Sequence, residues 1–353
     1  MKILLVRTSA LGDVVHALPV LRALRRHRPE ARVAWVVEQT FAPILADLPD
    51  LEAVFPVRLR AWRGRGVWSH RDELRGALRE IRAFGADIAF DLMGNHKGGA
   101  LARWSGARRV IGAARSFRRE PESALWIGEA VATPSPHAVD RGLDLLRALD
   151  IETRGEAVDF GREHLLRRPP SRDRALLEAF QALPRPRVLI QAGAGWVNKT
   201  YPPERWGAVA RRLAAASATV VVPTAPGEVG LARRLSAAST GPDGQPTARL
   251  VDGTDFATFA ALCRHADLLL GGDTGPMHLA HALGTPVLAL HGPTDPVRHG
   301  PHGAPAHALI HRLPCSFCHK RFDAAKACLL ALTPERVAAR ALERLASARA
   351  DRG

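Results

Sequence analysis

The residues with the clearest chemical potential form a tight group at 273–278, where the chain reads DTGPMH directly after an apolar run. That order predicts a buried strand followed by a helix start, whose free amides and dipole attract phosphate. Asp273 and Thr274 are candidates to cap the helix, Gly275 allows close approach to the backbone, and His278 lies one turn on. Asp273 would accept hydrogen bonds from amides or sugar hydroxyls. The alternative is an ordinary capped helix with a partly buried histidine.

Two more charged residues follow predicted strands in the same half of the chain. Lys199 lies in the loop of QAGAGWVNKTYPPERW, and Glu228 lies at a helix start in VVPTAPGEVG. The lysine would counter the charge of a leaving diphosphate, and the glutamate would bind ribose hydroxyls. The alternatives are a solvated lysine and a glutamate that favours the helix dipole by about 0.3–1 kcal/mol. The turn HGPTDP at 291–296 is predicted to border the same crevice.

The loop TSALGD, residues 8–13, follows the first predicted strand and precedes the first helix. Gly12 allows close backbone approach, and Asp13 is a candidate general base at a cleft. An ordinary helix cap is the alternative. The spacing G-x-G-x-x-G is absent, which argues against a dinucleotide-binding dehydrogenase.

A basic loop, RLRAWRGRGVWSHR, occupies residues 58–71. Its arginines Arg58, Arg60, Arg63 and Arg65 suit bidentate contacts with carboxylate or phosphate groups. A solvated loop is the alternative.

Three cysteines lie close together in PCSFCHKRFDAAKAC, as a C-x2-C pair followed by a third. A zinc site needs four ligands, and only His311 or His319 would complete it. The spacing is loose, so we predict no metal site and no cofactor. Four cysteines in the whole chain fit a reducing compartment rather than a disulfide scaffold.

Composition limits the class of protein. The chain has 353 residues, 46% hydrophobic and 24% charged, and contains no apolar run long enough to span a bilayer. We therefore expect a soluble, cytoplasmic, globular protein of two domains. The net charge of +15, mostly from arginine, suits a nucleic acid, an anionic membrane surface or a phosphorylated substrate. The alternative is that the excess of arginine reflects biased codon usage and indicates no anionic partner.

The hydrophobic pattern predicts an α/β protein of two doubly wound domains, because apolar runs alternate with helical patterns in each half. Strands are predicted at 2–7, 32–37, 52–57, 86–91, 108–112, 187–191, 218–222, 248–252, 267–271 and 286–290. Helices are predicted at 13–27, 71–84, 97–105, 137–149, 173–182, 203–216, 227–238, 255–265 and 275–284. The predicted domains are 1–165 and 185–330, followed by an amphipathic helix at 333–353.

Together, TSALGDVVHALP, WVVEQTF, the RAWR loop, NKTYPPERW, DTGPMHLAHALGTP and HGPTDP resemble glycosyltransferase family 9, the ADP-heptose:lipopolysaccharide heptosyltransferases. The first half is most similar to the type I enzymes, whereas CSFCHKR is more similar to type II. The resemblance implies a GT-B fold, two Rossmann-like domains facing across a cleft. It also implies that the terminal helix crosses back to the first domain. Because the candidate base and the phosphate site lie in different predicted domains, closure of the cleft would bring them together and exclude water.

The resemblance further implies metal-independent, inverting transfer of L-glycero-D-manno-heptose from ADP-heptose to the Kdo sugar of Kdo2-lipid A. It makes Asp13 the base, and Lys199, Glu228, Asp273, Thr274, Gly275 and His278 donor contacts. The arginine loop would bind the acceptor, and the chain would attach peripherally to the cytoplasmic face of the inner membrane. A heptose acceptor, as for the type II enzymes, is the alternative. A basic nucleic-acid binder is a remote one, since no nucleic-acid motif is present.

Overall fold

The computed structural model describes residues 1–350 except 47, 60–69, 167–173, 226 and 322–325. Its internal contacts divide the chain into two compact units, Met1–Leu165 and Leu166–Gly353. Each unit contains one six-stranded sheet in which every strand pair is parallel. Within the described residues, no helix combines the length and the hydrophobicity that crossing a bilayer requires.

The sheet of the first unit has the strand order β3-β2-β1-β4-β5-β6. Its strands are β1 (Lys2–Val6), β2 (Arg32–Glu38), β3 (Ala53–Val57), β4 (Ile88–Asp91), β5 (Arg109–Ala113) and β6 (Glu129–Val131). The central strands are apolar on both faces, as expected for a parallel sheet covered on both sides. The order reverses between β1 and β4, so a ligand crevice is expected at their carboxyl ends.

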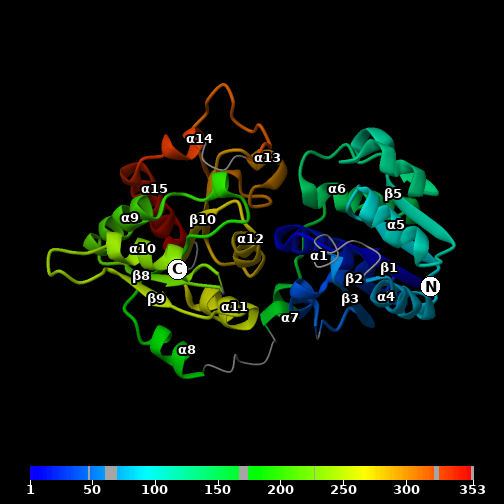
Figure 1. Cartoon of the computed structure of the whole chain (residues 1–353), viewed down its shortest axis with the longest axis horizontal. Helices are drawn as coiled ribbons and strands as arrows, with labels where there is room; N and C mark the ends of the chain where they lie inside the picture. Colours follow the sequence, from blue (N-terminus) through cyan, green and yellow to red (C-terminus); the bar gives the residue numbers. More distant parts are fainter. Residues whose placement is uncertain (47, 60–69, 167–173, 226, 322–325, 351–353) are drawn as a thin grey trace. The chain divides into compact units, whose positions relative to one another are not determined.

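Helices cover both faces of this sheet (Figure 1). They are α1 (Leu11–His27), α2 (Ala42–Leu45), α4 (Arg71–Phe84), α5 (His96–Trp104) and α6 (Ala138–Asp144), with 3-10 turns η1 (Gln39–Phe41), η3 (Arg115–Phe117), η4 (Pro121–Trp126) and η5 (Leu145–Leu149). Helices α4 and α5 share a core with the sheet, in which Ile81 and Leu101 pack beside Leu4 and Val36. Helix α1 packs against α6. Helix α7 (Arg162–Leu166) contains the boundary between the two units in the sequence.

The second unit repeats the same topology, with the order β12-β11-β10-β7-β8-β9. Its strands are β7 (Arg187–Gln191), β8 (Thr219–Pro223), β9 (Ala248–Val251), β10 (Leu268–Gly272), β11 (Val287–His291) and β12 (Ala308–Ile310). Here the order reverses between β7 and β10. The carboxyl ends of these two strands therefore form the expected ligand crevice of this unit.

The helices of the second unit also form two layers (Figure 1). They are α8 (Arg174–Gln181), α9 (Pro203–Ala215), α10 (Val229–Ala238), α11 (Phe256–His265), α12 (Gly275–Ala282), α13 (Pro296–His299), α14 (Ala327–Leu330) and α15 (Pro334–Ala350), with turns η6 (Val197–Lys199) and η7 (Pro305–His307). Helices α9, α10 and α15 share one core with the sheet. Helix α15 contributes Val337, Ala341 and Leu345 to that core, and a return of its end to the first unit stays a prediction.

The α/β prediction of two doubly wound sheets is confirmed, and the long elements lie within a few residues of their predicted bounds. Strands β6 and β12 were missed. Each has three residues and lies at a sheet edge, where partly exposed positions such as Glu129 and Ile310 interrupt the apolar pattern. Helix α6 ends at Asp144 and continues as the 3-10 turn η5, whereas one helix was predicted over 137–149.

Candidate active site

The strand-to-helix turn after β10 places Asp273 at the carboxyl edge of the second sheet, beside two cationic or polar partners. Its Oδ2 lies 2.6 Å from Nζ of Lys199, and its Oδ1 lies 3.0 Å from Nε2 of His278. The side chains of Lys199 and Asp273 are 15% and 6% exposed. Because a carboxylate only accepts hydrogen bonds, His278 donates from Nε2. Sequence reasoning placed these three residues in one site, and the structure brings them together.

The charge of Asp273 is fixed by these neighbours. Burial by itself raises the pKa of the Asp273 carboxyl. The hydrogen bond from His278 and the electrostatic interactions with His291 and Lys199 act in the opposite direction, and together they hold this pKa well below its usual range. Asp273 is therefore a carboxylate at neutral pH, and it holds the Lys199 ammonium at the crevice.

Buried polar atoms without a hydrogen-bond partner gather around this pair. Among the described residues they include Oγ1 of Thr274 and Oγ1 of Thr294. Neither ring nitrogen of His291 makes a hydrogen bond of normal geometry, although the backbone of Thr294 lies near the ring. An unsatisfied buried polar group costs about 1–3 kcal/mol, so such a group needs an explanation. Their position at the carboxyl edge of a parallel sheet is typical of a ligand site.

The predicted cap by Thr274 is wrong in one respect. Thr274 occupies the N-cap position of α12 with an extended backbone, but its side chain makes no capping hydrogen bond. Asp273 does not replace it, because both of its oxygens are directed to Lys199 and His278. Gly275 is the first residue of α12. The helix start therefore has amides that neither predicted cap satisfies, and such amides suit an anion.

Glu228 is held at the end of β7 by a second set of contacts. Its carboxylate accepts hydrogen bonds from Nε2 of Gln191 at 3.1 Å and from the amide of Ala225 at 3.3 Å. A Cβ at Gly193 would lie 1.9 Å from Oε1 of Glu228, so a larger residue there would push the glutamate side chain aside. Gln191 in turn packs against Gly271 of β10. Glu228 thus borders the same switch point as Asp273.

The cysteine-containing segment packs on the loop that carries Lys199. Nδ2 of Asn198 donates to the carbonyl of Lys320 at 2.9 Å, and the guanidinium of Arg321 lies over the Trp196 ring at 4.5 Å. Nζ of Lys199 lies at the same distance from that ring. Trp196 is thus a shared cation–π platform that fixes the lysine loop.

The cysteines in that segment are free thiols. In the described part of the chain, Cys315, Cys318 and Cys328 do not bring three ligand atoms within metal-binding distance of one another, with His311 or His319 included. The thiol of Cys328 lies against Gly292 of the HGPTDP turn, where it would be 2.7 Å from an added Cβ. Cys328 therefore packs behind the HGPTDP turn.

In the first unit, Asp13 lies in the first turn of α1, after the carboxyl end of β1. Its Oδ2 accepts a hydrogen bond from the amide of Ala10 at 2.9 Å, and its Oδ1 lies 2.5 Å from Nη2 of Arg7. The side chain is 33% exposed. Asp13 therefore does take part in capping α1, and its ion pair with Arg7 fixes its direction. Its role as a base stays a prediction.

An ion pair that sequence reasoning missed lies beside this turn. Nη2 of Arg118 is 2.5 Å from Oδ2 of Asp91 at the end of β4, and both side chains are fully buried. Oδ1 of Asp91 accepts a hydrogen bond from the amide of Met93 at 2.9 Å. Burial raises the pKa of Asp91, and Arg118 offsets part of that rise. A polar residue closing the apolar run ADIAFD was the available signal.

The arginine loop is described only in part. Arg58 follows β3 and is exposed. Its Nη1 lies 3.4 Å from Oε1 of Glu73 on α4. Arg60, Arg63 and Arg65 lie outside the described residues. Their acceptor-binding role therefore stays a prediction.

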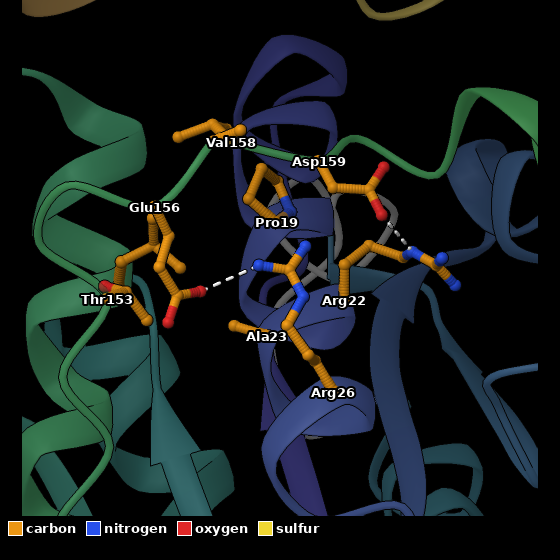
Figure 2. Close-up of a pocket in the computed structure, with 10 residues that line it drawn as sticks. Pro19, Arg22, Ala23, Arg26, Thr153, Glu156, Val158 and Asp159 are labelled. Carbon is orange, nitrogen blue, oxygen red and sulfur yellow. Dashed lines mark hydrogen bonds and ion pairs between the residues drawn. The ribbon is translucent and has the colours of Figure 1, made fainter.

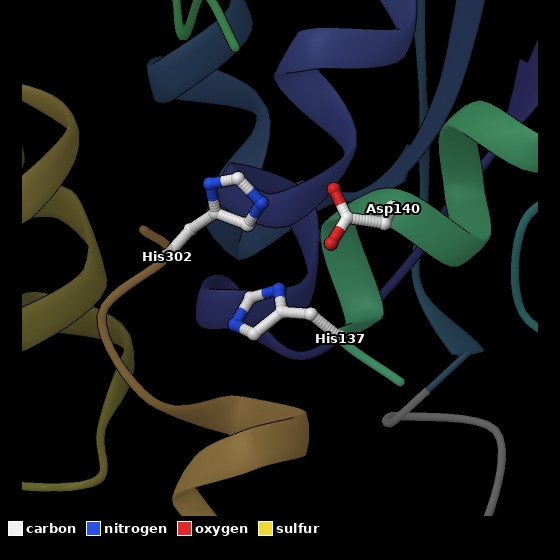
Figure 3. Close-up of side chains that lie close together, drawn as sticks. All are labelled: His137, Asp140 and His302. Atoms are coloured by element: carbon white, nitrogen blue, oxygen red, sulfur yellow. The ribbon is translucent and has the colours of Figure 1, made fainter. Parts of the chain in front are cut away.

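Two other polar groups of the first unit have structural roles. Ion pairs from Arg22 to Asp159 and from Arg26 to Glu156, at 2.9 and 2.7 Å, line a hollow between α1 and the segment 151–160 (Figure 2). They fasten that segment to the helix. At the start of α6 (Figure 3), Nδ1 of His137 accepts a hydrogen bond from the amide of Val139.

The fold and this crevice are typical of two-domain proteins that bind an anionic ligand at the carboxyl edge of a parallel sheet. The family model of glycosyltransferase family 9 (heptosyltransferase) matches residues 75–329. Lipopolysaccharide heptosyltransferase 1 of Pseudomonas aeruginosa is 32% identical over 91% of this chain and 87% of its own length. The enzyme of the same name from Escherichia coli K12 is 28% identical over 86% of this chain and 91% of its own length.

A solved structure of the E. coli heptosyltransferase WaaC with ADP is 25% identical, with a TM-score of 0.78, and covers 98% of this chain and 100% of that one. The structure of E. coli ADP-heptose lps heptosyltransferase II is 19% identical, with a TM-score of 0.76. The match covers 98% of this chain and 99% of that one, and it shows the same fold. The chain therefore belongs to glycosyltransferase family 9, and it is a glycosyltransferase with a GT-B fold.

Proposed function

We propose that this enzyme transfers L-glycero-D-manno-heptose from ADP-heptose to the Kdo sugar of Kdo2-lipid A, with inversion at the anomeric carbon. The observation that carries the proposal is the Lys199–Asp273–His278 network at the β7/β10 switch point of a family 9 chain. Support comes from relatives named lipopolysaccharide heptosyltransferase 1 and from similar structures that contain ADP or ADP-2-deoxy-2-fluoro heptose.

The second unit supplies the donor site in this proposal. The diphosphate binds at the start of α12, where Thr274 and Gly275 present the helix amides. Lys199 neutralises the charge that develops on the departing phosphate, and Asp273 and His278 hold the lysine in place. Glu228 accepts hydrogen bonds from the ribose hydroxyls.

The first unit supplies the base and the acceptor contacts. The acceptor hydroxyl attacks the anomeric carbon, its proton passes to the Asp13 carboxylate, and the bond from the anomeric carbon to the phosphate oxygen breaks. ADP leaves with that electron pair. The ion pair with Arg7 keeps Asp13 in one orientation, which favours proton transfer in a fixed geometry. Arg58, Arg60, Arg63 and Arg65 bind carboxylate and phosphate groups of the acceptor.

The proposal also covers the need for a metal ion, the place where the enzyme works and the binding of nucleic acid. The reaction needs no metal ion, because Lys199 and the helix amides supply the positive charge. The chain works at the cytoplasmic face of the inner membrane, where a lipid-anchored acceptor and a net charge of +15 favour peripheral attachment. A nucleic-acid role is not part of the proposal.

The experiment is turnover with ADP-heptose and two acceptors, Kdo2-lipid A and its monoheptosylated product. ADP release and the mass of the product are measured with and without EDTA. The proposal expects one added heptose on Kdo2-lipid A, unchanged by EDTA. Transfer only to the heptosylated acceptor would support the type II alternative, and a strong loss with EDTA would contradict metal independence.

A further inference from the structure

The first unit exposes aromatic and apolar side chains on two adjacent elements, α5 and η4. Trp104 is 41% exposed and Leu125 is 68% exposed. The rings of Trp104 and Trp126 contact each other edge to face, with centroids 5.8 Å apart. Exposed large apolar residues that gather in this way mark an interaction site more often than isolated ones do. We call Trp104, Leu125 and Trp126, with Arg103 and Arg119, the α5–η4 surface.

This surface is held rigidly by the fold. Nε1 of Trp126 donates a hydrogen bond to Nδ1 of His96 at 3.1 Å. The Trp126 side chain packs so closely on Gly99 that a Cβ there would lie 2.8 Å from it. Nε of Arg82 donates to the carbonyl of Trp104 at 2.8 Å, which fixes the end of α5 to α4. The aromatic pair is therefore presented by ordered elements.

Basic residues outnumber acidic ones in the segment that carries these apolar side chains. Residues 96–126 contain seven lysines and arginines but only two glutamates. Arg103, Arg108, Arg115 and Arg119 are exposed. One of the glutamates, Glu120, already accepts a hydrogen bond from the amide of His96 at 2.9 Å. Such a surface would repel a second copy of itself, whereas it complements anionic phosphate headgroups.

Tryptophan, leucine and arginine together match the interface of an anionic bilayer. Tryptophan prefers the headgroup level, leucine enters the acyl boundary, and arginine binds lipid phosphates. We propose that the α5–η4 surface is the site at which this enzyme docks on anionic lipid. The inference rests on the proposed function, since it names the membrane-binding surface of the same enzyme.

The position of α5 gives this docking a use. Helix α5 begins just after β4, at the carboxyl edge of the sheet where the turn carrying Asp13 follows β1. The α5–η4 surface therefore extends from the edge at which the acceptor is expected to bind. Docking there would bring the sugar of a lipid-anchored acceptor to that edge while its acyl chains stay in the bilayer.

The test is flotation of the full-length protein with vesicles of phosphatidylcholine, alone or mixed with phosphatidylglycerol. The test variant combines Leu125→Ser with Arg103→Glu. The control variant combines Leu330→Ser with Arg249→Glu, an exposed leucine and an exposed arginine of the second unit. Thermal unfolding of each variant establishes that it is folded.

We expect the wild-type protein to bind the mixed vesicles, to bind them less as NaCl is raised, and to bind neutral vesicles weakly. The test variant should bind on the order of 10-fold less, and the control variant should bind like the wild type. Equal binding by test variant and wild type, an equal loss in the control, or no binding by the wild type would overturn the inference. So would a folded test variant that changes a dimer into a monomer without vesicles, because the surface would then be a subunit interface.

ADP binding by the wild type, measured in the absence of vesicles, separates this inference from the proposed function. Vesicle binding through the α5–η4 surface without ADP binding would contradict the donor site alone. ADP binding with no effect of the test variant on vesicle binding would contradict the docking surface alone.

Discussion

Lys199 and Asp273 form an ion pair at the switch point of the second sheet, with 2.6 Å between Nζ and Oδ2 and with little exposure of either side chain. One partner comes from the loop after β7 and the other from the turn after β10, 74 residues apart. A nearly buried pair of this kind is not an efficient way to gain stability, because desolvation opposes the attraction. Its position at a ligand crevice gives it a functional explanation.

Replacing Lys199 by alanine should therefore affect both binding and stability. Among the described residues, the variant leaves the buried Asp273 side chain with His278 as its remaining hydrogen-bond partner, which lowers the free energy of unfolding by about 3 kcal/mol. ADP affinity, measured by calorimetry, should fall at least about 10-fold, because charge-assisted hydrogen bonds contribute about 1.5–3 kcal/mol. Lys320→Ala is the control, since that side chain is exposed. Unchanged ADP affinity in Lys199→Ala would remove the lysine from the donor site.

Two glycines of one loop offer a matched pair of variants. A Cβ at Gly193 would lie 1.9 Å from Oε1 of Glu228, whereas a Cβ at Gly195 would meet nothing within 4 Å. Gly193→Ala should displace Glu228 from Gln191 and lower the affinity for ADP by about 10-fold, through loss of hydrogen bonds to a charged group. Gly195→Ala should bind ADP as the wild type does. Equal affinities for the two variants would argue against Glu228 as a ribose contact.

We expect the buried ring of His291 to lower the free energy of unfolding. Its ring is buried beside Asp273 without a hydrogen bond of normal geometry, so His291→Phe should raise the free energy of unfolding by about 1 kcal/mol. Burial lowers the pKa of His291, the nearby charges of His278 and Lys199 lower it further, and Asp273 opposes them. Below its usual pKa of about 6.5, the unfolded chain then binds a proton that the folded chain does not.

Stability of the wild type should accordingly fall as the pH drops from about 7 to 5, and this fall should be smaller in His291→Phe. Thr294→Val is the control: it removes another unpaired hydroxyl, so it should not destabilise the fold, but it keeps the titratable ring. Urea unfolding across that pH range measures all three proteins. The same pH dependence in His291→Phe and wild type would show that the ring does not titrate as described.

Asp13→Asn separates proton transfer from donor binding. The amide oxygen of asparagine can still accept the hydrogen bond from the Ala10 amide, so α1 should form normally. Transfer should fall by a factor of about 100 or more, because a general base contributes about 10²–10⁴ in rate. ADP affinity should be unchanged. A variant that loses ADP affinity, or that retains full transfer, would show that Asp13 is not the base.

The sequence predicts those site residues that lie in the loops directly after predicted strands. Asp273, Lys199 and Glu228 each come directly after an apolar run or its first loop, so a parallel sheet brings them to one edge. The same pattern places Asp13 after β1. These predictions need only local order and the rule that ligands bind at the carboxyl edge.

The missed features depend on contacts across the fold. Asp91 and Arg118 are 27 residues apart, and no local pattern pairs them. Thr274 has the sequence of a cap, but its hydroxyl is buried in the crevice without a partner. His291 belongs to the turn that was predicted to border this crevice, but only the register that pairs Gly272 with Leu290 shows that its ring lies beside Asp273. The partners of these side chains are determined by tertiary packing rather than by local sequence propensity.

We propose above all that the start of α12 and Lys199 hold the donor diphosphate. A crystal structure of this enzyme with ADP-heptose or a non-transferable analogue tests it most directly. We predict phosphate oxygens within about 3.5 Å of Nζ of Lys199 and of the first amides of α12. A diphosphate bound elsewhere, with the Lys199–Asp273 pair untouched and distant from it, would contradict the account.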